Sequence, residues 1–336
     1  MRLVKTVKTV KTVKTVKTVK TVKTVAAAGP HWLLLGKTAE LRCASSRKPL
    51  KLPVNDGKLV LWQDSASEMH AMDDVCPHRG ASLSTGRVDR DCIRCPYHNH
   101  GINGSRRDGG AFSLLHEAGN TWVSTAPGSS SLLLPPPPGS DAYPEFSLPG
   151  YRTVAYHKDL VGVNPVLMME NTLDWSHLAY VHRVHFVEGT PTVTIRRRGT
   201  SGLAEYVYSS ELFELRIENE YHAPYTSSLR FLFRDKKTGE DLPALLLWFS
   251  FTPTGGDRVR LHLRIARGVL TAAPLLTDAL FKLVDELPLL EDVTLVRDVD
   301  ASRWSSNALT PADEFVASYR DVMISLFPDI VDRFVS

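Results

Sequence analysis

The chain has 336 residues, 43% of them hydrophobic, with 21 glycines and 21 prolines, which is enough for two globular domains rich in strands and turns. Its net charge of +3 comes from residues 1–25, which carry eight basic side chains and no acid; the rest has 32 basic and 37 acidic residues. This mildly acidic body gives no support for nucleic-acid binding, and the lack of an apolar run of about 18 residues argues against a membrane-spanning helix.

The N-terminal tail is a low-complexity repeat. Residues 5–25 read Lys-Thr-Val seven times. A period of three fits neither a helix nor a strand and cannot bury a core, so we expect residues 1–30 to be disordered. The tail is basic, hydroxyl-rich and free of acids, as in organelle-targeting peptides, but its strict repetition fits a repeat expansion or gene-boundary artefact equally well. The compartment is therefore left open between the cytoplasm and an organelle such as a plastid.

Residues 31–125 are expected to form a small all-β domain. The turn signal Asn55-Asp-Gly57 precedes the apolar run Lys58–Trp62, which is typical of a strand. Short strands and glycine-rich turns fill the rest of this range. Residues 126–148 are rich in proline and serine, and the run Pro135–Pro138 predicts an extended, semi-rigid linker.

Residues 149–336 show a different pattern, in which helices flank several strands. Strands are expected at Thr192–Arg197, Glu205–Leu215, Ser227–Phe233, Leu245–Thr252 and Arg258–Ile265, and helices at Pro274–Leu287 and Thr310–Leu326. The last helix has an N-cap threonine followed by proline and two acids in its first turn. This order predicts an α+β domain whose sheet curls around a ligand. No dinucleotide fingerprint or phosphate loop is present, so a nicotinamide or flavin site is not indicated.

The first metal-binding pattern lies in the β domain. Cys76-Pro-His78 and Cys95-Pro-Tyr-His98 are separated by 16 residues. Cysteines clustered with histidines indicate metal rather than disulfides, and a reducing compartment. Two thiolates and two imidazoles can hold zinc tetrahedrally, or a 2Fe–2S cluster with the thiolates on one iron and the imidazoles on the other.

These loops resemble the Rieske signature, because Cys76-Pro-His-Arg-Gly-Ala-x-Leu-Ser84 matches its first loop closely. The resemblance implies a 2Fe–2S cluster held by Cys76, His78, Cys95 and His98, with structural zinc as the minor alternative. His98 is preferred over His100 by the Cys-x-x-His spacing, and Cys92 is an extra thiol, expected to be buried. One departure is Asn99-His100, where the family has Gly-Trp.

The second pattern lies in residues 170–185, which contain Asp174, His177 and His182. Two imidazoles and carboxylates suit ferrous iron with open positions. Asp174 and His177 are three apart and would share a helix face. His177 and His182 are five apart, so a shared metal requires a distorted turn or a helix end there. The rival pair is His182 with His185.

Asn171-x-x-Asp174-x-x-His177-x4-His182 resembles the mononuclear iron motif of Rieske non-haem iron oxygenases. The resemblance implies that His177 and His182 are iron ligands. It gives Asp174 and Asn171 catalytic roles: Asp174 links an iron-bound histidine to the Rieske histidine of a neighbouring subunit, and Asn171 lies near the iron. The third ligand is expected downstream in a Glu-Asp pair, where Asp292 is preferred to Glu291 and Asp298.

The resemblance implies an α+β fold in which a small all-β Rieske domain (31–125) precedes a helix-grip, START-like catalytic domain (149–336) with a curved antiparallel sheet. It implies the terminal oxygenase subunit of a multicomponent system, a homotrimer reduced by a ferredoxin or flavin reductase. Length favours the vanillate demethylase and chlorophyll-pigment oxygenase class, which hydroxylates or O-demethylates small organic substrates with O2. Pigment-oxidising members typically have a C-terminal membrane anchor, which this chain lacks.

Two alternatives stay open, a Rieske electron-transfer protein and a ligand-binding protein without catalytic iron. Metal content separates them, at about three irons per chain for the enzyme and about two for the others. The segments Leu212–Leu215 and Leu245–Phe251 are candidates for lining a substrate pocket, although core strands have the same composition.

Overall fold

The computed structural model describes residues 31–46, 48–103, 111–127, 137–183, 191–268, 288–306 and 308–335. The tail at residues 1–30, most of the linker's centre (128–136), His185 and the helix expected at Pro274–Leu287 lie outside these residues. Within the described part of the chain, none of the helices is both long and apolar enough to cross a membrane.

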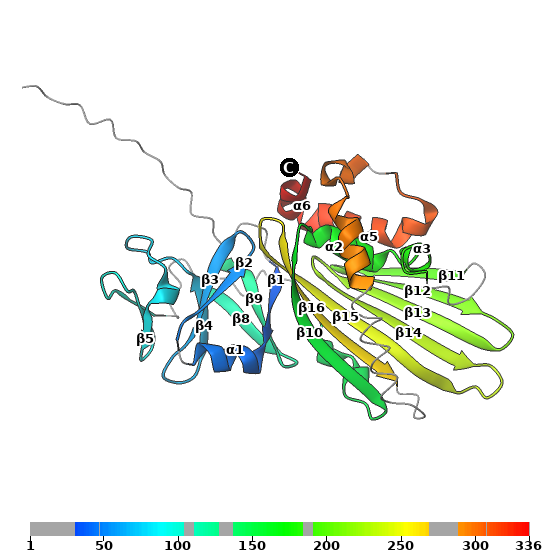
Figure 1. Cartoon of the computed structure of the whole chain (residues 1–336), viewed down its shortest axis with the longest axis horizontal. Coiled ribbons are helices and arrows are strands. Elements are labelled where there is room, and N and C mark those ends of the chain that lie inside the picture. The colour runs from blue at the N-terminus through cyan, green and yellow to red at the C-terminus, as the bar shows by residue number, and fades with distance from the viewer. Residues whose placement is uncertain are drawn as a thin grey trace, which may run out of the picture.

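The N-terminal domain is built on a six-stranded antiparallel sheet in the order β1-β9-β8-β4-β3-β2 (Figure 1). Its elements are β1 (Trp32–Lys37), α1 (Thr38–Ser45), β2 (Leu50–Val54), β3 (Gly57–Gln63), β4 (Met69–Asp73), β8 (Ala111–Glu117) and β9 (Asn120–Pro127). The turn expected at Asn55-Asp-Gly57 joins β2 to β3, and Asn55 has a φ of 49°, a left-handed conformation that asparagine tolerates.

A separate three-stranded sheet carries the two Cys/His loops. It consists of β5 (Arg87–Asp89), β6 (Cys92–Arg94) and β7 (Gly101–Asn103), and the short 3-10 helix η1 (Leu83–Thr85) precedes it. Its small core packs against the first sheet and contains Val60, Trp62, Met72, Leu83, Ile93 and Ile102 together with two cysteines, Cys76 and Cys95. Apolar side chains of the two sheets thus pack against the two Cys/His loops and hold them in place.

The C-terminal domain is a seven-stranded antiparallel sheet in the order β10-β16-β15-β14-β13-β12-β11. The strands are β10 (Tyr151–Val161), β11 (Thr192–Arg198), β12 (Ser201–Ser209), β13 (Phe213–His222), β14 (Thr226–Asp235), β15 (Asp241–Gly255) and β16 (Arg258–Gly268). Figure 1 shows the helices gathered on one face of this curved sheet. They are α2 (Pro165–Leu173), α3 (His177–Tyr180), the helical residues 288–297, α5 (Glu314–Leu326) and α6 (Pro328–Val335).

Short 3-10 helices complete the fold: η2 (Ser140–Ala142), η3 (Pro144–Phe146), η4 (Ala301–Ser306) and η5 (Pro311–Asp313). The predicted start of the last helix is confirmed in detail. The backbone N–H and hydroxyl of Thr310 both donate to the Asp313 carboxylate, at 2.7 and 2.8 Å. The first turn is η5, and the α-helix proper begins at Glu314.

One predicted strand, Glu205–Leu215, is wrong. It is the end of β12 and the start of β13, joined by a tight turn at Ser210. The Ser210 hydroxyl accepts hydrogen bonds from the backbone N–H groups of Leu212 and Phe213, at 3.3 and 3.1 Å, and so closes the hairpin. Leu212, a candidate pocket residue, therefore lies at this turn with 58% of its surface exposed.

The two domains share one hydrophobic core. It combines Leu33, Leu35 and Val123 of the first domain with residues of the large sheet and its helices. A polar link crosses the same boundary, because the buried hydroxyl of Thr252 donates to the backbone carbonyl of Leu34 at 2.6 Å. The sheets are therefore packed together directly.

Candidate metal centres

The four predicted cluster ligands come together at the tip of the three-stranded sheet. The two thiols are buried, each with 2% exposure, while His78 and His98 are exposed and their ring centroids lie 4.8 Å apart. The backbone N–H of Cys76 donates to the carbonyl of Ala81 at 2.8 Å, and that of Cys95 to the carbonyl of His100 at 2.9 Å. Each loop is thus a tight turn that brings one thiol and one imidazole to the same place.

The surroundings of the Cys95 thiol favour its thiolate form. Burial opposes ionisation of Cys95, but the backbone N–H groups of Tyr97 and His98 and the thiol of Cys76 outweigh it and lower the pKa of the Cys95 thiol. Two thiols and two imidazoles around one point fit a 2Fe–2S cluster of the Rieske type. Cys92 is half-buried, so the expectation that it is buried was wrong; it lies on β6, outside the loops.

The departure at Asn99 has a local explanation. Asn99 has a φ of 57°, in the left-handed region where Gly80 of the first loop also lies. Asparagine tolerates this conformation better than other residues with a side chain. Its side-chain oxygen accepts a hydrogen bond from Arg87 at 2.9 Å, which ties the second loop to β5.

The second centre begins with α2, whose start is well defined. The Asn164 side chain accepts a hydrogen bond from the backbone N–H of Val166 at 2.8 Å, and Pro165 occupies the first helical position. The helix is buried on almost every side, and it ends at Leu173. A separate short helix, α3, starts at His177.

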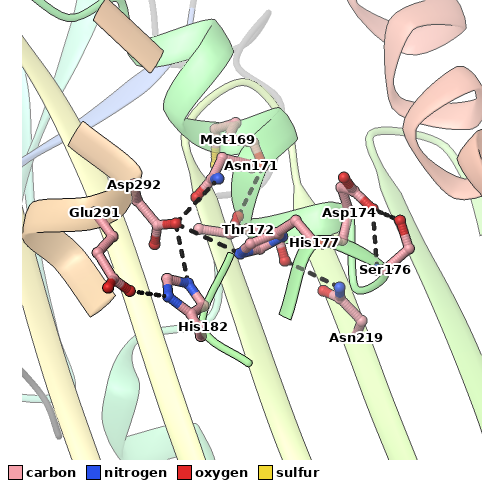
Figure 2. Close-up of polar contacts among 10 residues, drawn as sticks. All are labelled: Met169, Asn171, Thr172, Asp174, Ser176, His177, His182, Asn219, Glu291 and Asp292. Carbon is pink, nitrogen blue, oxygen red and sulfur yellow. Dashed lines mark hydrogen bonds and ion pairs between the residues drawn. The ribbon is translucent and has the colours of Figure 1, made fainter. Parts of the chain in front are cut away.

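Residues 174–176 form a break between α2 and α3, and α3 ends at Tyr180. This helix end lies between His177 and His182 and so meets the geometric condition set by their spacing. Asp174 lies in the break and not on a helix, so the expected shared helical face does not exist. Instead the ring Nδ1 of His177 contacts the backbone carbonyl of Asp174. His182 follows α3 after one turn, which lets both rings turn toward the same point (Figure 2).

The third predicted ligand, Asp292, lies at that point. Its Oδ1 is 3.0 Å from Nε2 of His182 and 3.5 Å from Nε2 of His177. The three ligand atoms lie within 4.8 Å of one another, and this is the one such cluster of three among the described residues. Asn171 donates to the same Oδ1 at 3.3 Å. Two imidazoles and one carboxylate fit ferrous iron with open positions.

Glu291, which was weighed only as a rival ligand, has a different place. Its carboxylate accepts from Nδ1 of His182 at 2.8 Å, on the ring edge opposite the metal-facing Nε2 (Figure 2). Burial opposes the charged imidazole, but the hydrogen bonds to Asp292 and Glu291 raise the pKa of His182. The same negative charge would favour a bound cation. Asp298, the other rival, follows the helical residues 288–297 and is exposed.

Asp174 points away from the three converging ligands in Figure 2. Its Oδ1 accepts from the backbone N–H and the hydroxyl of Ser176, at 2.9 and 2.6 Å. A residue that the sequence did not reveal holds the break from below: the buried Asn219 donates to the carbonyls of Thr172 and Leu173 at 3.0 and 3.3 Å. These carbonyls are left without helical partners where α2 ends.

A cavity of about 180 Å³ opens beside the three ligands. Its walls come from α2, the break, α3, the start of the helical residues 288–297 and strands β14, β15 and β16. The candidate pocket segment of β15 is confirmed as lining, with Leu245, Leu247, Phe249 and Phe251. The two candidate centres therefore differ: the first is exposed at a tip, and the second is the floor of a cavity.

Comparisons with known proteins match both halves. The model of the Rieske [2Fe-2S] domain matches residues 31–112, and that of the vanillate O-demethylase oxygenase C-terminal domain matches residues 161–327. The dicamba O-demethylase oxygenase component of Stenotrophomonas maltophilia is 31% identical over 159 residues, 42% of this chain and 44% of the relative. A 3-ketosteroid-9-alpha-monooxygenase oxygenase component of Rhodococcus rhodochrous is 26% identical over 164 residues, which are 45% of this chain and 43% of the relative. These alignments span less than half of either relative.

Solved structures show the same fold over nearly the whole chain. A crystal structure of dicamba monooxygenase bound to dicamba superposes with a TM-score of 0.66 at 19% identity, covering 93% of this chain and 99% of that one. With both domain models in their expected order and the fold shared throughout, the chain belongs to the Rieske non-haem iron oxygenases.

Proposed function

We propose that the protein is the oxygenase component of a multicomponent system that hydroxylates or O-demethylates a small organic substrate with O2. The observation that carries this proposal is the convergence of His177, His182 and Asp292 at the floor of a cavity. A protein that only carries electrons needs no second metal site next to a cavity. The O-demethylase and monooxygenase relatives support the same reaction classes.

Each side chain has a task in this proposal. Cys76, Cys95, His78 and His98 hold the 2Fe–2S cluster, and His177, His182 and Asp292 hold ferrous iron. The cluster supplies electrons, and the iron supplies redox chemistry with O2. Asn171 fixes the Asp292 carboxylate, and Glu291 orients the His182 ring. The apolar walls exclude water from the reacting face of the substrate.

We propose a ferredoxin or flavin reductase as the electron donor and a homotrimer as the working assembly. In Figure 1 the sheet that carries the cluster loops lies at one end of the molecule, and the six-stranded sheet lies between it and the helices around the iron residues. Transfer within one chain would have to cross that sheet, so a neighbouring chain is the better source. Asp174, which Ser176 holds in place, is the group we propose to meet the neighbour's cluster histidine.

The test is the Asp292→Ala variant, made in protein reconstituted with iron and sulfide. Wild type should contain about three irons per chain, and the variant about two with an unchanged Rieske EPR signal. Asp298→Ala, an exposed acid six residues further on, is the matched control and should retain all three. Equal iron content and equal substrate-dependent O2 uptake in wild type and Asp292→Ala would contradict the proposal.

A further inference from the structure

We propose that the cavity beside His177, His182 and Asp292 selects an uncharged, largely apolar substrate with few hydrogen-bonding groups. Such a substrate would be held by the shape of the cavity and not by polar contacts. The inference rests on the proposed function, because it names the substrate class of that same site. It separates this chain from proteins that take organic anions, such as the relative whose structure contains dicamba. The argument comes from the composition of the wall and from the partners of its polar groups.

The sheet side of the cavity is entirely apolar in the described residues. Three strands contribute to it, and all of their lining side chains are aliphatic or aromatic: Leu229, Phe231, Leu245, Leu247, Phe249, Phe251, Leu263 and Ile265. Leu247 lies at the centre, because it pairs across the sheet with Leu229 on one side and Ile265 on the other. Trp175, Leu178 and Leu289 extend the apolar surface to the helical side.

Most of the polar lining groups have partners elsewhere in the protein. Asn171 donates to Asp292, and the Thr172 hydroxyl is shared between the carbonyl of Met169 and the hydroxyl of Ser227. Asp174 is held by Ser176, and the remaining polar lining groups are the three proposed iron ligands. No lysine or arginine lines the cavity among the described residues.

The nearest candidate for an anion-binding group on this face is Arg267. It is the cross-strand partner of Leu245, it is 6% exposed, and it lies outside the cavity lining. Arg267 also interacts with other groups of the protein. A carboxylate placed against Leu247 or Phe249 would lose its water without gaining a partner, and this cost decides against anions.

The experiment compares three ligands that share one body: 4-tert-butyltoluene, 4-tert-butylbenzamide and 4-tert-butylbenzoate. Binding to the iron-loaded protein without O2 is followed by tryptophan fluorescence, because Trp175 lines the cavity. Trp175→Phe identifies the part of the signal that comes from the cavity. We expect the toluene to bind at least about tenfold more tightly than the benzoate, with the benzamide between them, following the cost of burying each polar group.

Two variants test whether the apolar wall at Leu247 causes this order of affinities. Leu247→Arg should reverse the order by giving the benzoate a partner, whereas Leu247→Met should keep the wild-type order. Benzoate binding to wild type as tightly as the toluene would overturn the inference, and loss of that binding in Arg267→Met would assign the anion site to Arg267. The inference about substrate class and the proposed function can fail independently. The order of ligand affinities measured by fluorescence does not depend on turnover, and the iron content of the protein does not depend on which ligand binds.

Discussion

The two carboxylates of the Glu-Asp pair do different things although they are adjacent in sequence. Asp292 faces the metal-binding nitrogens of both histidines, and Glu291 faces the far nitrogen of one of them. A carboxylate on the far nitrogen fixes the tautomer and orientation of an imidazole ligand and raises its basicity. In the proposed iron centre, consecutive residues would therefore supply one ligand and the group that orients another ligand.

Glu291→Gln should weaken ferrous iron binding by about 10–100-fold, because the amide keeps the hydrogen-bonding geometry and removes the charge behind His182. Competition between the protein and a chelator measures this affinity. Asp298→Asn, which removes an equal charge from the same region without touching a ligand, should leave the affinity within about twofold. An unchanged affinity in Glu291→Gln would show that His182 is oriented by other groups.

Six of the seven proposed metal ligands could be predicted from local sequence patterns. Cys76 with His78, Cys95 with His98, and His177 with His182 each lie within a few residues, and rare side chains at fixed spacing carry the signal. Asp292 was predicted only through the family resemblance, and other contacts over long sequence separations could not be predicted. Glu291 meets His182 across 109 positions, and Asn219 reaches the end of α2 across 46 and 47 positions.

At the scale of elements, period-two patterns predicted strands well and turns poorly. The apolar segment Leu245–Phe251 was a candidate for lining a pocket, and every second residue of it, from Leu245 to Phe251, lines the cavity. The hairpin at Ser210 was missed because a single serine hydroxyl closes it, within a stretch that otherwise alternates. The break after Leu173 was not predicted, since the sequence there contains no glycine or proline.

A buried ion pair links α2, the helix that precedes the proposed iron ligands, to α5. Glu170 precedes Asn171 on α2 and accepts from Arg320 of α5 at 2.7 and 2.8 Å and from the indole of Trp304 at 2.5 Å. The Glu170 and Arg320 side chains are 11% and 13% exposed. Arg320 of α5 and Trp304 of η4 thereby hold α2, which carries Asn171 and ends just before the break that precedes His177.

Arg320→Met should destabilise the protein by about 3–5 kcal/mol, because it leaves the Glu170 carboxylate buried without its partner. The matched control is Arg197→Met, which breaks an exposed pair between β11 and the same helix, with Asp321 at 3.0 Å, and should cost about 0–1 kcal/mol. Urea unfolding measures both. An equal loss of unfolding free energy in the two variants would mean that the buried pair contributes no more to stability than the exposed one.

At the scale of the whole molecule, the charge at the cluster tip has the opposite sign to that of the body. Residues 76–88 and 95–103 contain Arg79 and Arg87 and no carboxylate, and both arginines are exposed beside the cluster loops. The chain beyond residue 25 carries 32 basic and 37 acidic residues. A donor protein with acidic groups around its redox centre would be attracted to this tip despite the net charge.

Oxidation of the dithionite-reduced cluster by small complexes tests the local charge. We expect the rate with ferric EDTA, an anion, to fall as salt is added, and the rate with hexaammineruthenium(III), a trication, to rise. Stopped-flow absorbance of the cluster follows both. Arg79→Gln with Arg87→Gln should flatten the first dependence, whereas Arg258→Gln at the start of β16 should not. Salt effects that follow the net negative charge of residues 26–336 would show that the tip is covered or neutralised in the assembled protein.

The core shared by the two domains also bears on how such a protein can be altered. Leu33, Leu35 and Val123 pack into the same apolar cluster as the large sheet, so the described residues of the two domains are packed directly against each other. Exchanging the N-terminal module for that of another protein would therefore require repacking the boundary, Thr252 included. Variation in this chain is accommodated more easily at the cavity wall, where a new side chain changes what is accepted and leaves the frame intact.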